Sequence, residues 1–388
     1  MKPIARIPYG KQHIDSNDLT IVKQSLKASL ITTGSYVLNF EKKLKKYLGS
    51  RYALSCNSGT SAIHLAMMAA EIKQGDNIIM PSVNFVASGN IAKMLNANIF
   101  LADVDPLSGQ MTGTSVEECI KKNKLKKIKL LVTMYLGGYP DNITEFYNLK
   151  KKFNFLILED ACHALGASYQ FKNRFLKIGS CKHSDIAAFS LHPLKSITTG
   201  EGGVVSTNNR KFYEKLKLLR SHGIVKNKDP FNHKYNVKFS GLNNRLSDIN
   251  CALGITQLKK IKKFITKKKL FSKYYDNIFK NITGIKLGHS QLNKNISAWH
   301  LYILIINFSY FKTTRLKFMK YLYKKNIISQ VHYIPIYMHS NFKKLEKNYL
   351  INTKSYYDRC ISIPLYYDMS AKQQNKVVLE IKNFLKIK

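Results

Sequence analysis

The sequence predicts an α/β protein in which a large domain with a mainly parallel mixed sheet is followed by a smaller α+β domain. Three observations support this fold class. The chain has 388 residues, enough for two domains with substantial cores. Short apolar runs alternate with amphipathic stretches over roughly the first 250 residues. Beyond residue 257 the pattern becomes lysine-rich and mixed.

Seven apolar runs in the N-terminal part have the length of strands. They comprise residues 53–55, 77–80, 97–102, 129–135, 155–158, 186–190 and 203–206. Between them, stretches such as 61–71 and 143–152 show the helical period of apolar residues. Because the strands are apolar on both faces, we expect a mainly parallel sheet covered by helices on both sides.

The C-terminal part begins with a long helical segment at residues 258–279. Mixed strands and helices follow, including the apolar run 299–306. No repeat or low-complexity linker marks a boundary, so the change of pattern defines it. We therefore place the domains at residues 1–256 and 257–388.

The chain carries a formal net charge of +40, from 63 Lys and Arg against 23 Asp and Glu. Such a charge is typical of proteins that neutralise nucleic-acid phosphates. Here the lysines are spread along the chain and do not form one arm or stripe, so nucleic acid is not the partner we expect. A positive field would still attract an anionic substrate such as a nucleotide diphosphate.

Neither a membrane partner nor a metal is indicated. The sequence has no run of roughly 18 uninterrupted apolar residues, and its first residues do not resemble a signal peptide. The six cysteines show no CxxC pairing, which argues against a zinc site or a disulfide framework. We expect a cytoplasmic protein.

The most informative stretch is residues 190–203, SLHPLKSITTGEGG, which places Lys195 after the apolar run 185–189 and among hydroxyls and glycines. A lysine held there can lose its proton and attack a carbonyl. Pyridoxal phosphate (PLP) is tethered in this way, as a Schiff base. Lysines are abundant in this chain, so it is the context of Lys195 that supports the role.

A second stretch, residues 55–61 (SCNSGTS), lies between a predicted strand and a predicted helix. Small residues at a helix start leave backbone N–H groups free, and the helix dipole adds partial positive charge, so a phosphate can bind there. Ser and Thr are also common as ordinary N-caps, and that alternative stays open.

A third stretch, residues 156–166 (LILEDACHALG), puts Asp160 at the carboxyl end of a buried strand, where ligands bind in open α/β sheets. A carboxylate there can keep the PLP ring nitrogen protonated. His163 could bond the ring hydroxyl or stack on the ring. The alternative for Asp160 is a cap on the following helix.

The order of these features, a phosphate site, then an acid, then a lysine, resembles the fold-type I PLP enzymes, which include aspartate aminotransferase. Within that group, residues 159–166 and 190–203 are similar to signatures of the DegT/DnrJ/EryC1/StrS sugar aminotransferases. The resemblance covers nearly the whole chain. It implies a PLP-binding large domain with residues 1–14 as an arm near the site, and a homodimer with shared active sites.

Carried over by position, the resemblance implies that Lys195 forms the Schiff base, Asp160 pairs with the ring nitrogen and Phe85 stacks on the ring. Pyridoxamine phosphate (PMP) is the implied aminated intermediate. The implied phosphate contacts are Ser190, Gly59, Thr60 and, from the neighbouring subunit, Asn243.

Residues 219–225, 244–259 and 329–337 are similar to family members that aminate C4 of a UDP-linked 4-keto-6-deoxy-N-acetyl hexosamine in pseudaminic acid biosynthesis, with glutamate as donor. Candidate substrate contacts, each of which can equally be structural, are Tyr9, His222, His300, His332 and Tyr333.

Three alternatives remain. The first is another UDP- or dTDP-keto sugar, of the legionaminic acid, bacillosamine or perosamine type. The second is a related PLP-dependent dehydratase, although those proteins typically carry histidine where Lys195 stands. The third is a basic nucleic-acid-binding or regulatory protein without catalytic activity.

Overall fold

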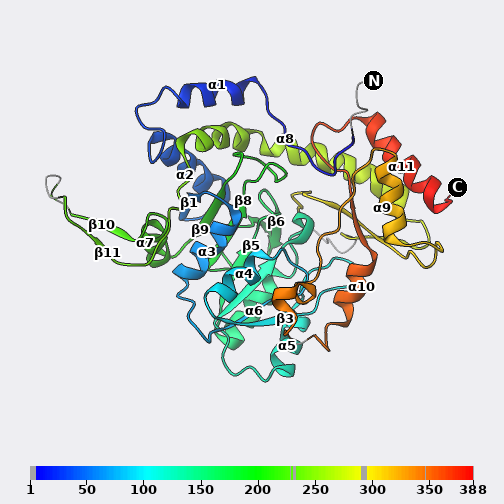
Figure 1. Cartoon of the computed structure of the whole chain (residues 1–388), viewed down its shortest axis with the longest axis horizontal. Helices are drawn as coiled ribbons and strands as arrows, with labels where there is room; N and C mark the ends of the chain where they lie inside the picture. The colour runs from blue at the N-terminus through cyan, green and yellow to red at the C-terminus, as the bar shows by residue number, and fades with distance from the viewer. Residues whose placement is uncertain (1–5, 228, 230–232, 290–294, 346, 388) are drawn as a thin grey trace.

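The computed structural model describes residues 6–227, 229, 233–289, 295–345 and 347–387. Its centre is a seven-stranded sheet with helices on both faces (Figure 1). The strands are β1 (Tyr52–Cys56), β2 (Asn77–Pro81), β3 (Asn98–Ala102), β4 (Leu130–Met134), β5 (Leu156–Asp160), β8 (Ile186–Ser190) and β9 (Gly203–Thr207). They lie side by side in the order β1, β9, β8, β5, β4, β2, β3. Each of the seven predicted strands is present.

The sheet is mainly parallel, as predicted. Neighbouring strands from β8 to β3 run parallel to one another. The exception is β9, which pairs antiparallel with both β8 and β1. The segment 191–202, which joins β8 to β9, contains no helix. A parallel return needs a crossover, usually a helix, so the chain reverses direction here.

Helices cover the two faces because successive side chains of each strand point to opposite sides. Leu130 and Val132 pack in one cluster, with α3 (Gly59–Ala69), α4 (Ala87–Met94) and α7 (Arg210–Leu219). Leu131, between them, packs with helices on the opposite face. That face is covered by α2 (Ser35–Leu48), α5 (Gly113–Lys122), α6 (Ile143–Phe153) and the first part of α8 (Asp248–Phe279).

The C-terminal part has its own antiparallel sheet and core. Its strands are β12 (Ile285–Leu287), β13 (Tyr302–Ile306) and β14 (Cys360–Ile363). Its helices are α9 (Arg315–Lys324), α10 (Ile351–Arg359) and α11 (Ala371–Leu385), with short 3-10 turns at Ile336–Met338 and Ser340–Phe342. Phe279, Tyr302, Phe318 and Ile381 lie together in this core.

Helix α8 connects the two parts (Figure 1). It packs against α1 (Ser16–Ser25) and α2 near its start and against β12 near its end. The boundary expected between residues 256 and 257 therefore lies inside this helix. No helix among the described residues is long and apolar enough to span a membrane.

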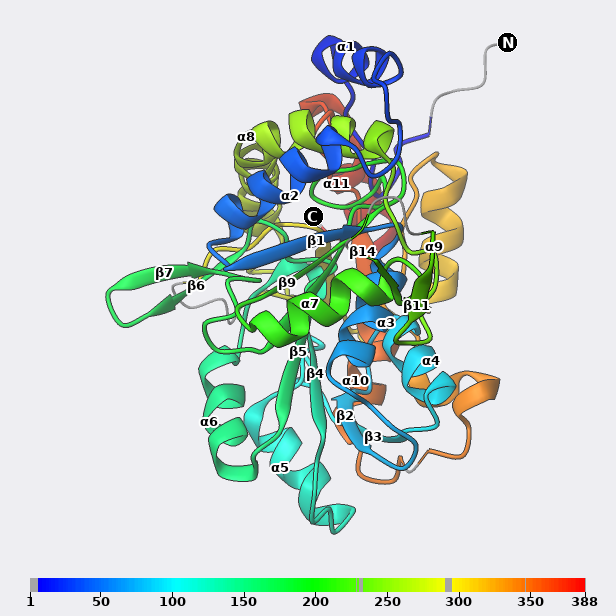
Figure 2. The same ribbon diagram turned by 90° about the vertical axis from the view of Figure 1, so that its left-hand side faces the viewer.

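The remaining elements extend from this body. The hairpin of β6 (Ser168–Phe171) and β7 (Arg174–Lys177) projects from the edge of the molecule in Figure 2. A second hairpin, of β10 (Ile224–Lys226) and β11 (Tyr235–Val237), projects on the left in Figure 1. A further 3-10 turn lies at Leu136–Gly138.

The described part of the N-terminal arm lies against the C-terminal part. Ile7 forms a parallel bridge with Ile327, and the backbone oxygen of Tyr9 accepts a hydrogen bond from the N–H of Leu365. Residues 1–5 of the predicted arm lie outside the described residues.

Candidate active site

A cavity of about 320 Å³ lies beyond the carboxyl ends of β4, β5 and β8, whose last residues, Met134, Asp160 and Ser190, line it. This is the edge at which open α/β sheets bind ligands. The predicted site residues found in its wall are Tyr9, Gly59, Thr60, Phe85, Asp160, His163, Ser190, Lys195, His300, His332 and Tyr333.

The start of α3 forms one wall of the cavity. Ser58 is the N-cap, and its hydroxyl accepts a hydrogen bond from the N–H of Ser61. The N–H groups of Gly59 and Thr60, in the first turn, have no partner within the helix. A Cβ atom on Gly59 would lie 2.7 Å from the Cβ of Ser190. Only glycine allows this helix start to approach the end of β8 so closely.

Asp160 is 2% exposed at the end of β5. Its carboxylate accepts hydrogen bonds from the hydroxyl of Ser88 at 3.2 Å and from the N–H of Cys162 at 3.3 Å. Burial raises the pKa of Asp160, while these hydrogen bonds and the nearby Lys195 act in the opposite direction. A cation facing the carboxylate would stabilise its charged form further.

Lys195 lies in the segment between β8 and β9, where its backbone N–H donates to the oxygen of His192. Burial lowers the pKa of its side chain, and Cys162 and Asp160 partly oppose this. A lower pKa increases the fraction of neutral amine near pH 7, and the neutral amine is the nucleophile and the base.

His163 is held in one tautomer by its neighbours. Its Nδ1 lies 3.4 Å from the N–H of Gly137, from which it accepts, so the ring proton is on Nε2. Nε2 can then donate to the Tyr333 hydroxyl at 2.9 Å. Burial, together with Lys195, His300 and His332, holds the pKa of His163 well below its usual value. The imidazole is therefore neutral.

Two of the predicted substrate contacts, His300 and His332, lie near this histidine. The ring of His300 lies 4.1 Å from that of His163, centroid to centroid. Nδ1 of His332 lies 2.8 Å from the hydroxyl of Ser362, and burial lowers the pKa of His332 to about 3. Phe85, half exposed, has its ring 5.7 Å from that of Tyr333.

Two predicted residues do not reach the cavity of their own chain. His222 and Asn243 are exposed and lie near each other, because Ser221 and Asn243 form an antiparallel bridge. The backbone oxygen of Asn243 accepts a hydrogen bond from the side chain of Asn57 at 3.3 Å. Asn57 is the residue before the N-cap of α3. Both residues are thus on the surface at the base of the β10–β11 hairpin.

A family model for the DegT/DnrJ/EryC1/StrS aminotransferases matches residues 12–382. The chain belongs to this family. A UDP-4-amino-4,6-dideoxy-N-acetyl-beta-L-altrosamine transaminase from Campylobacter jejuni is 36% identical, over 94% of each chain. The structure of Helicobacter pylori PseC, an aminotransferase involved in the biosynthesis of pseudoaminic acid, matches at a TM-score of 0.89 and 30% identity. This match covers 98% of this chain and 99% of the PseC chain.

Fold similarity extends to more distant structures. Spr1654 from Streptococcus pneumoniae, solved in PLP and PMP forms, has a TM-score of 0.88 at 23% identity and covers 98% of this chain and 99% of its own. The predicted fold class, the DegT family and the assignment as an aminotransferase that uses PLP are confirmed.

Sequence reasoning missed several residues of this DegT-family site. Ser88, which donates to Asp160, lies in the first turn of α4, three residues after Phe85. His192 and Glu201 line the cavity from within the lysine stretch, and Cys162 lies between Asp160 and His163. Proximity in sequence could have suggested the last three. Ser88 is also near the predicted Phe85, but its contact with Asp160, 72 residues later, depends on tertiary packing.

The residues present fit PLP. A helix start with free N–H groups beside a serine hydroxyl suits a phosphate. A buried carboxylate and an amine of lowered pKa line the same cavity. The close approach at Gly59, which any Cβ would block, preserves this arrangement.

Proposed function

We propose that this protein transfers an amino group from glutamate to C4 of a nucleotide-linked 4-keto-6-deoxy sugar. The sugar we favour is UDP-4-keto-6-deoxy-N-acetyl-altrosamine, in pseudaminic acid biosynthesis, and the reaction would take place in the cytoplasm. The observation that carries the proposal is one cavity in which Lys195, Asp160 and the start of α3 meet. The named relatives at 33% to 36% identity support this choice of sugar.

PLP, when bound, supplies an aldehyde for amino groups and a cationic ring that accepts electron density. In this proposal the start of α3 and Ser190 hold its phosphate, Asp160 faces the ring nitrogen and Phe85 stacks on the ring. His163 is neutral, and with its proton on Nε2 it could donate a hydrogen bond to the ring hydroxyl or stack on the ring.

Lys195 has two tasks in the proposed reaction. Its amine would be the point of covalent attachment for PLP, and as a free amine it would take up and return a proton as general base and acid at the substrate carbon. The lowered pKa of Lys195 suits both tasks, because the neutral amine is the form that attacks and that accepts a proton.

Asp160 acts through its charge. Held by Ser88 and the N–H of Cys162, the carboxylate is oriented before the ring binds, so no reorganisation is needed as charge develops. Glutamate and the keto sugar then use the same site in turn, in a ping-pong sequence.

We propose further that the protein is a homodimer in which each site is completed by the other subunit. His222 and Asn243 lie outside their own cavity, on an exposed hairpin base, which supports a role in a neighbouring site. Asn243 would there reach the cofactor phosphate.

The test of the substrate is a panel of UDP- and dTDP-4-keto-6-deoxy sugars incubated with glutamate. We expect the highest kcat/KM for the UDP-linked N-acetyl altrosamine precursor. A higher value for a bacillosamine, legionaminic acid or perosamine precursor would replace the sugar and leave the reaction type intact. Absence of amination with every sugar would overturn the proposal.

The test of the covalent site is borohydride reduction of the yellow protein, followed by peptide mapping. We expect one pyridoxyl label, on Lys195. A label on any other lysine would contradict the assigned attachment point. The abundance of lysines in this chain makes the mapping discriminating.

A further inference from the structure

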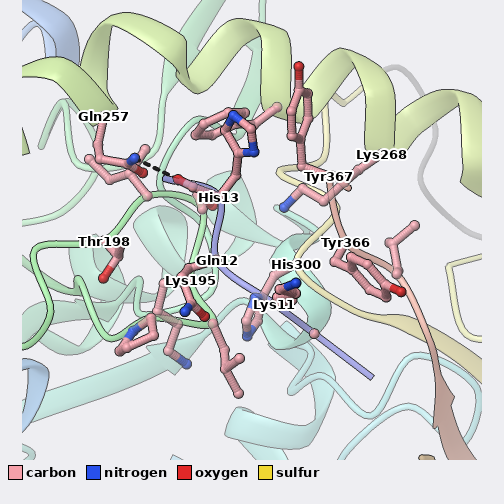
Figure 3. Close-up of a pocket in the computed structure, with 17 residues that line it drawn as sticks. Lys11, Gln12, His13, Lys195, Thr198, Gln257, Lys268, His300, Tyr366 and Tyr367 are labelled. Atoms are coloured by element: carbon pink, nitrogen blue, oxygen red, sulfur yellow. Dashed lines mark hydrogen bonds between the residues drawn. The ribbon is translucent and has the colours of Figure 1, made fainter. Parts of the chain in front are cut away.

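A second, smaller cavity adjoins the active site and shares Lys195 and His300 with it (Figure 3). Its wall comes from five parts of the chain that lie far apart in sequence: residues 10–13, residues 193–198, α8, His300 and residues 365–367. The free volume is about 30 Å³. Since a water needs about 10–15 Å³ on this measure, the cavity can hold a halide or one carboxylate group but no sugar ring.

Lys268 of α8 is the most unusual residue of this wall. It is 6% exposed, and its side chain points into the cavity in Figure 3. Within the described residues it forms no ion pair. Burial lowers the pKa of Lys268 to about 8. Buried lysines are almost always paired, so an uncompensated ammonium group calls for an anion.

His300 supplies a second polar group without a partner. It is 7% exposed, and its Nδ1 has no hydrogen-bond partner among the described residues. Burial, with Lys195 and Lys268 among the other causes, holds the pKa of His300 well below its usual value. The neutral imidazole can carry its proton on Nδ1 and donate to an anion.

The remaining charges at the cavity have the same sign. Lys11 and Lys195 also line it, and no Asp or Glu does. His13, at the edge, is already paired with Asp368 at 2.9 Å, outside the cavity wall. The lining itself therefore provides cations and donors and no acidic group. Lys195 has a carboxylate nearby, Asp160, which lines the adjoining cavity.

We propose that this cavity binds one small monovalent anion, a halide or a single carboxylate group, between Lys268 and His300. The bound anion stabilises the cationic form of Lys268 and, at the shared wall, of Lys195. Anion binding is then linked to the protonation of the amine that attaches the cofactor. The proposal depends on the cavity alone and holds for any sugar substrate.

Bromide is the probe, with isethionate at equal ionic strength as the reference anion, because isethionate has no carboxylate and its sulfonate group is too large for the cavity. Crystals of the unsubstituted protein grown in sodium bromide should show an anomalous bromine peak beside Lys268. In solution, bromide in place of isethionate should raise the thermal midpoint of the unsubstituted protein and of Lys269→Met. Lys269 is an exposed neighbour on α8, so this variant controls for the loss of one positive charge.

The shift should be lost in Lys268→Met. The same measurement with formate and with glutamate distinguishes two possible ligands of the cavity, a free small anion and the carboxylate of the amino donor. No bromine peak, with equal shifts in Lys268→Met and Lys269→Met, would overturn the proposal. If Lys268→Met does not fold, the bromine density alone decides. The result is independent of amination activity, so a wrong assignment of the reaction would not affect it.

Discussion

At Asp160, two hydrogen bonds from neutral donors orient a buried carboxylate so that it can face a cation. The Ser88 hydroxyl and the Cys162 N–H each donate to one of its oxygens, while burial removes water from both. Burial favours the neutral form, and the donors favour the charged form. A ring nitrogen in the cavity gains a proton most readily when this balance lies on the charged side.

We expect Asp160→Asn to lower kcat by about 10²–10³-fold, the usual effect of removing one preorganised electrostatic group. Ser88→Ala should have a smaller effect, within about 100-fold, since it removes one hydrogen bond to a charged group. Steady-state kinetics would measure both, and thermal midpoints would verify folding. Near-normal turnover in Asp160→Asn would mean that another group faces the ring.

Lys268 predicts a pH dependence of stability with a defined sign. Its folded-state pKa of about 8 lies below the ordinary value of 10.5. Between these pH values the unfolded chain binds more protons at this residue, so stability rises with pH across the window. The difference in pKa corresponds to about 3 kcal/mol of unfolding free energy. Below pH 8 the buried ammonium group lowers the stability of the folded protein by this amount.

Urea unfolding of the unsubstituted protein and of Lys268→Met, from pH 7.5 to 10.5 in isethionate, would measure this contribution. We expect the difference in unfolding free energy between the two to change by up to about 3 kcal/mol, in favour of the unsubstituted protein as pH rises. Parallel curves would show that Lys268 is not desolvated. In bromide the change should begin at higher pH, because a bound anion raises the pKa.

At the scale of elements, the strands of the central sheet could be predicted because each is a short apolar run between helical patterns. The direction of β9 could not, since antiparallel pairing depends on how segment 191–202 turns back. Helix α8 begins at Asp248, about ten residues before the predicted start. Its first turns carry polar residues that pack on α1 and α2, which weakens the apolar pattern.

The approach of α3 to β8 predicts a cofactor phenotype for Gly59→Ala. The added Cβ would lie 2.7 Å from that of Ser190, so the helix start must move. Such overpacking costs about 1–3 kcal/mol, and 1.4 kcal/mol is tenfold in affinity. We expect PLP affinity to fall about tenfold or more, measured by absorbance titration.

Gly49→Ala is the matched control for this substitution. Gly49 is the C-cap of α2, with φ +73° and open space around it. Alanine there should lower stability through backbone strain and leave PLP affinity unchanged. Equal losses of affinity in both variants would show that the effect at Gly59 is one of general destabilisation.

Asp248 joins two helices by capping a neighbour's N-terminus. Its carboxylate, fully buried in the first turn of α8, accepts from the N–H groups of Gly34, Tyr36 and Val37 at 2.7, 2.9 and 3.3 Å. Asp248→Ala should cost about 3 kcal/mol or more in urea unfolding, since three buried donors lose their acceptor. Asp358→Ala, which breaks an exposed pair with Lys354, should cost within about 0.5 kcal/mol.

At the scale of the whole molecule, both cavities are formed by segments that the sequence separates widely. That Asp160 and Lys195 line one cavity could be predicted, because Asp160 ends one strand, Lys195 follows another, and the ends of these strands meet at one edge of the sheet. The second cavity could not, because its wall joins residues 10–13 to residues 365–367 through tertiary packing alone. In sequence, Lys268 is one of many lysines in α8, and its burial is what distinguishes it.

Mixed subunits test the proposed dimer. Lys195→Ala and Asn243→Ala would each be nearly inactive alone if every site takes Lys195 from one chain and Asn243 from the other. In a hybrid dimer one site then contains both defects and the other contains none.

With two-fold symmetry and random mixing of equal amounts, about a quarter of all sites regain both native residues. Activity measured after unfolding and refolding the mixture should rise to that level. If both residues of a site came from one chain, mixing would restore nothing, because every site would keep one defect.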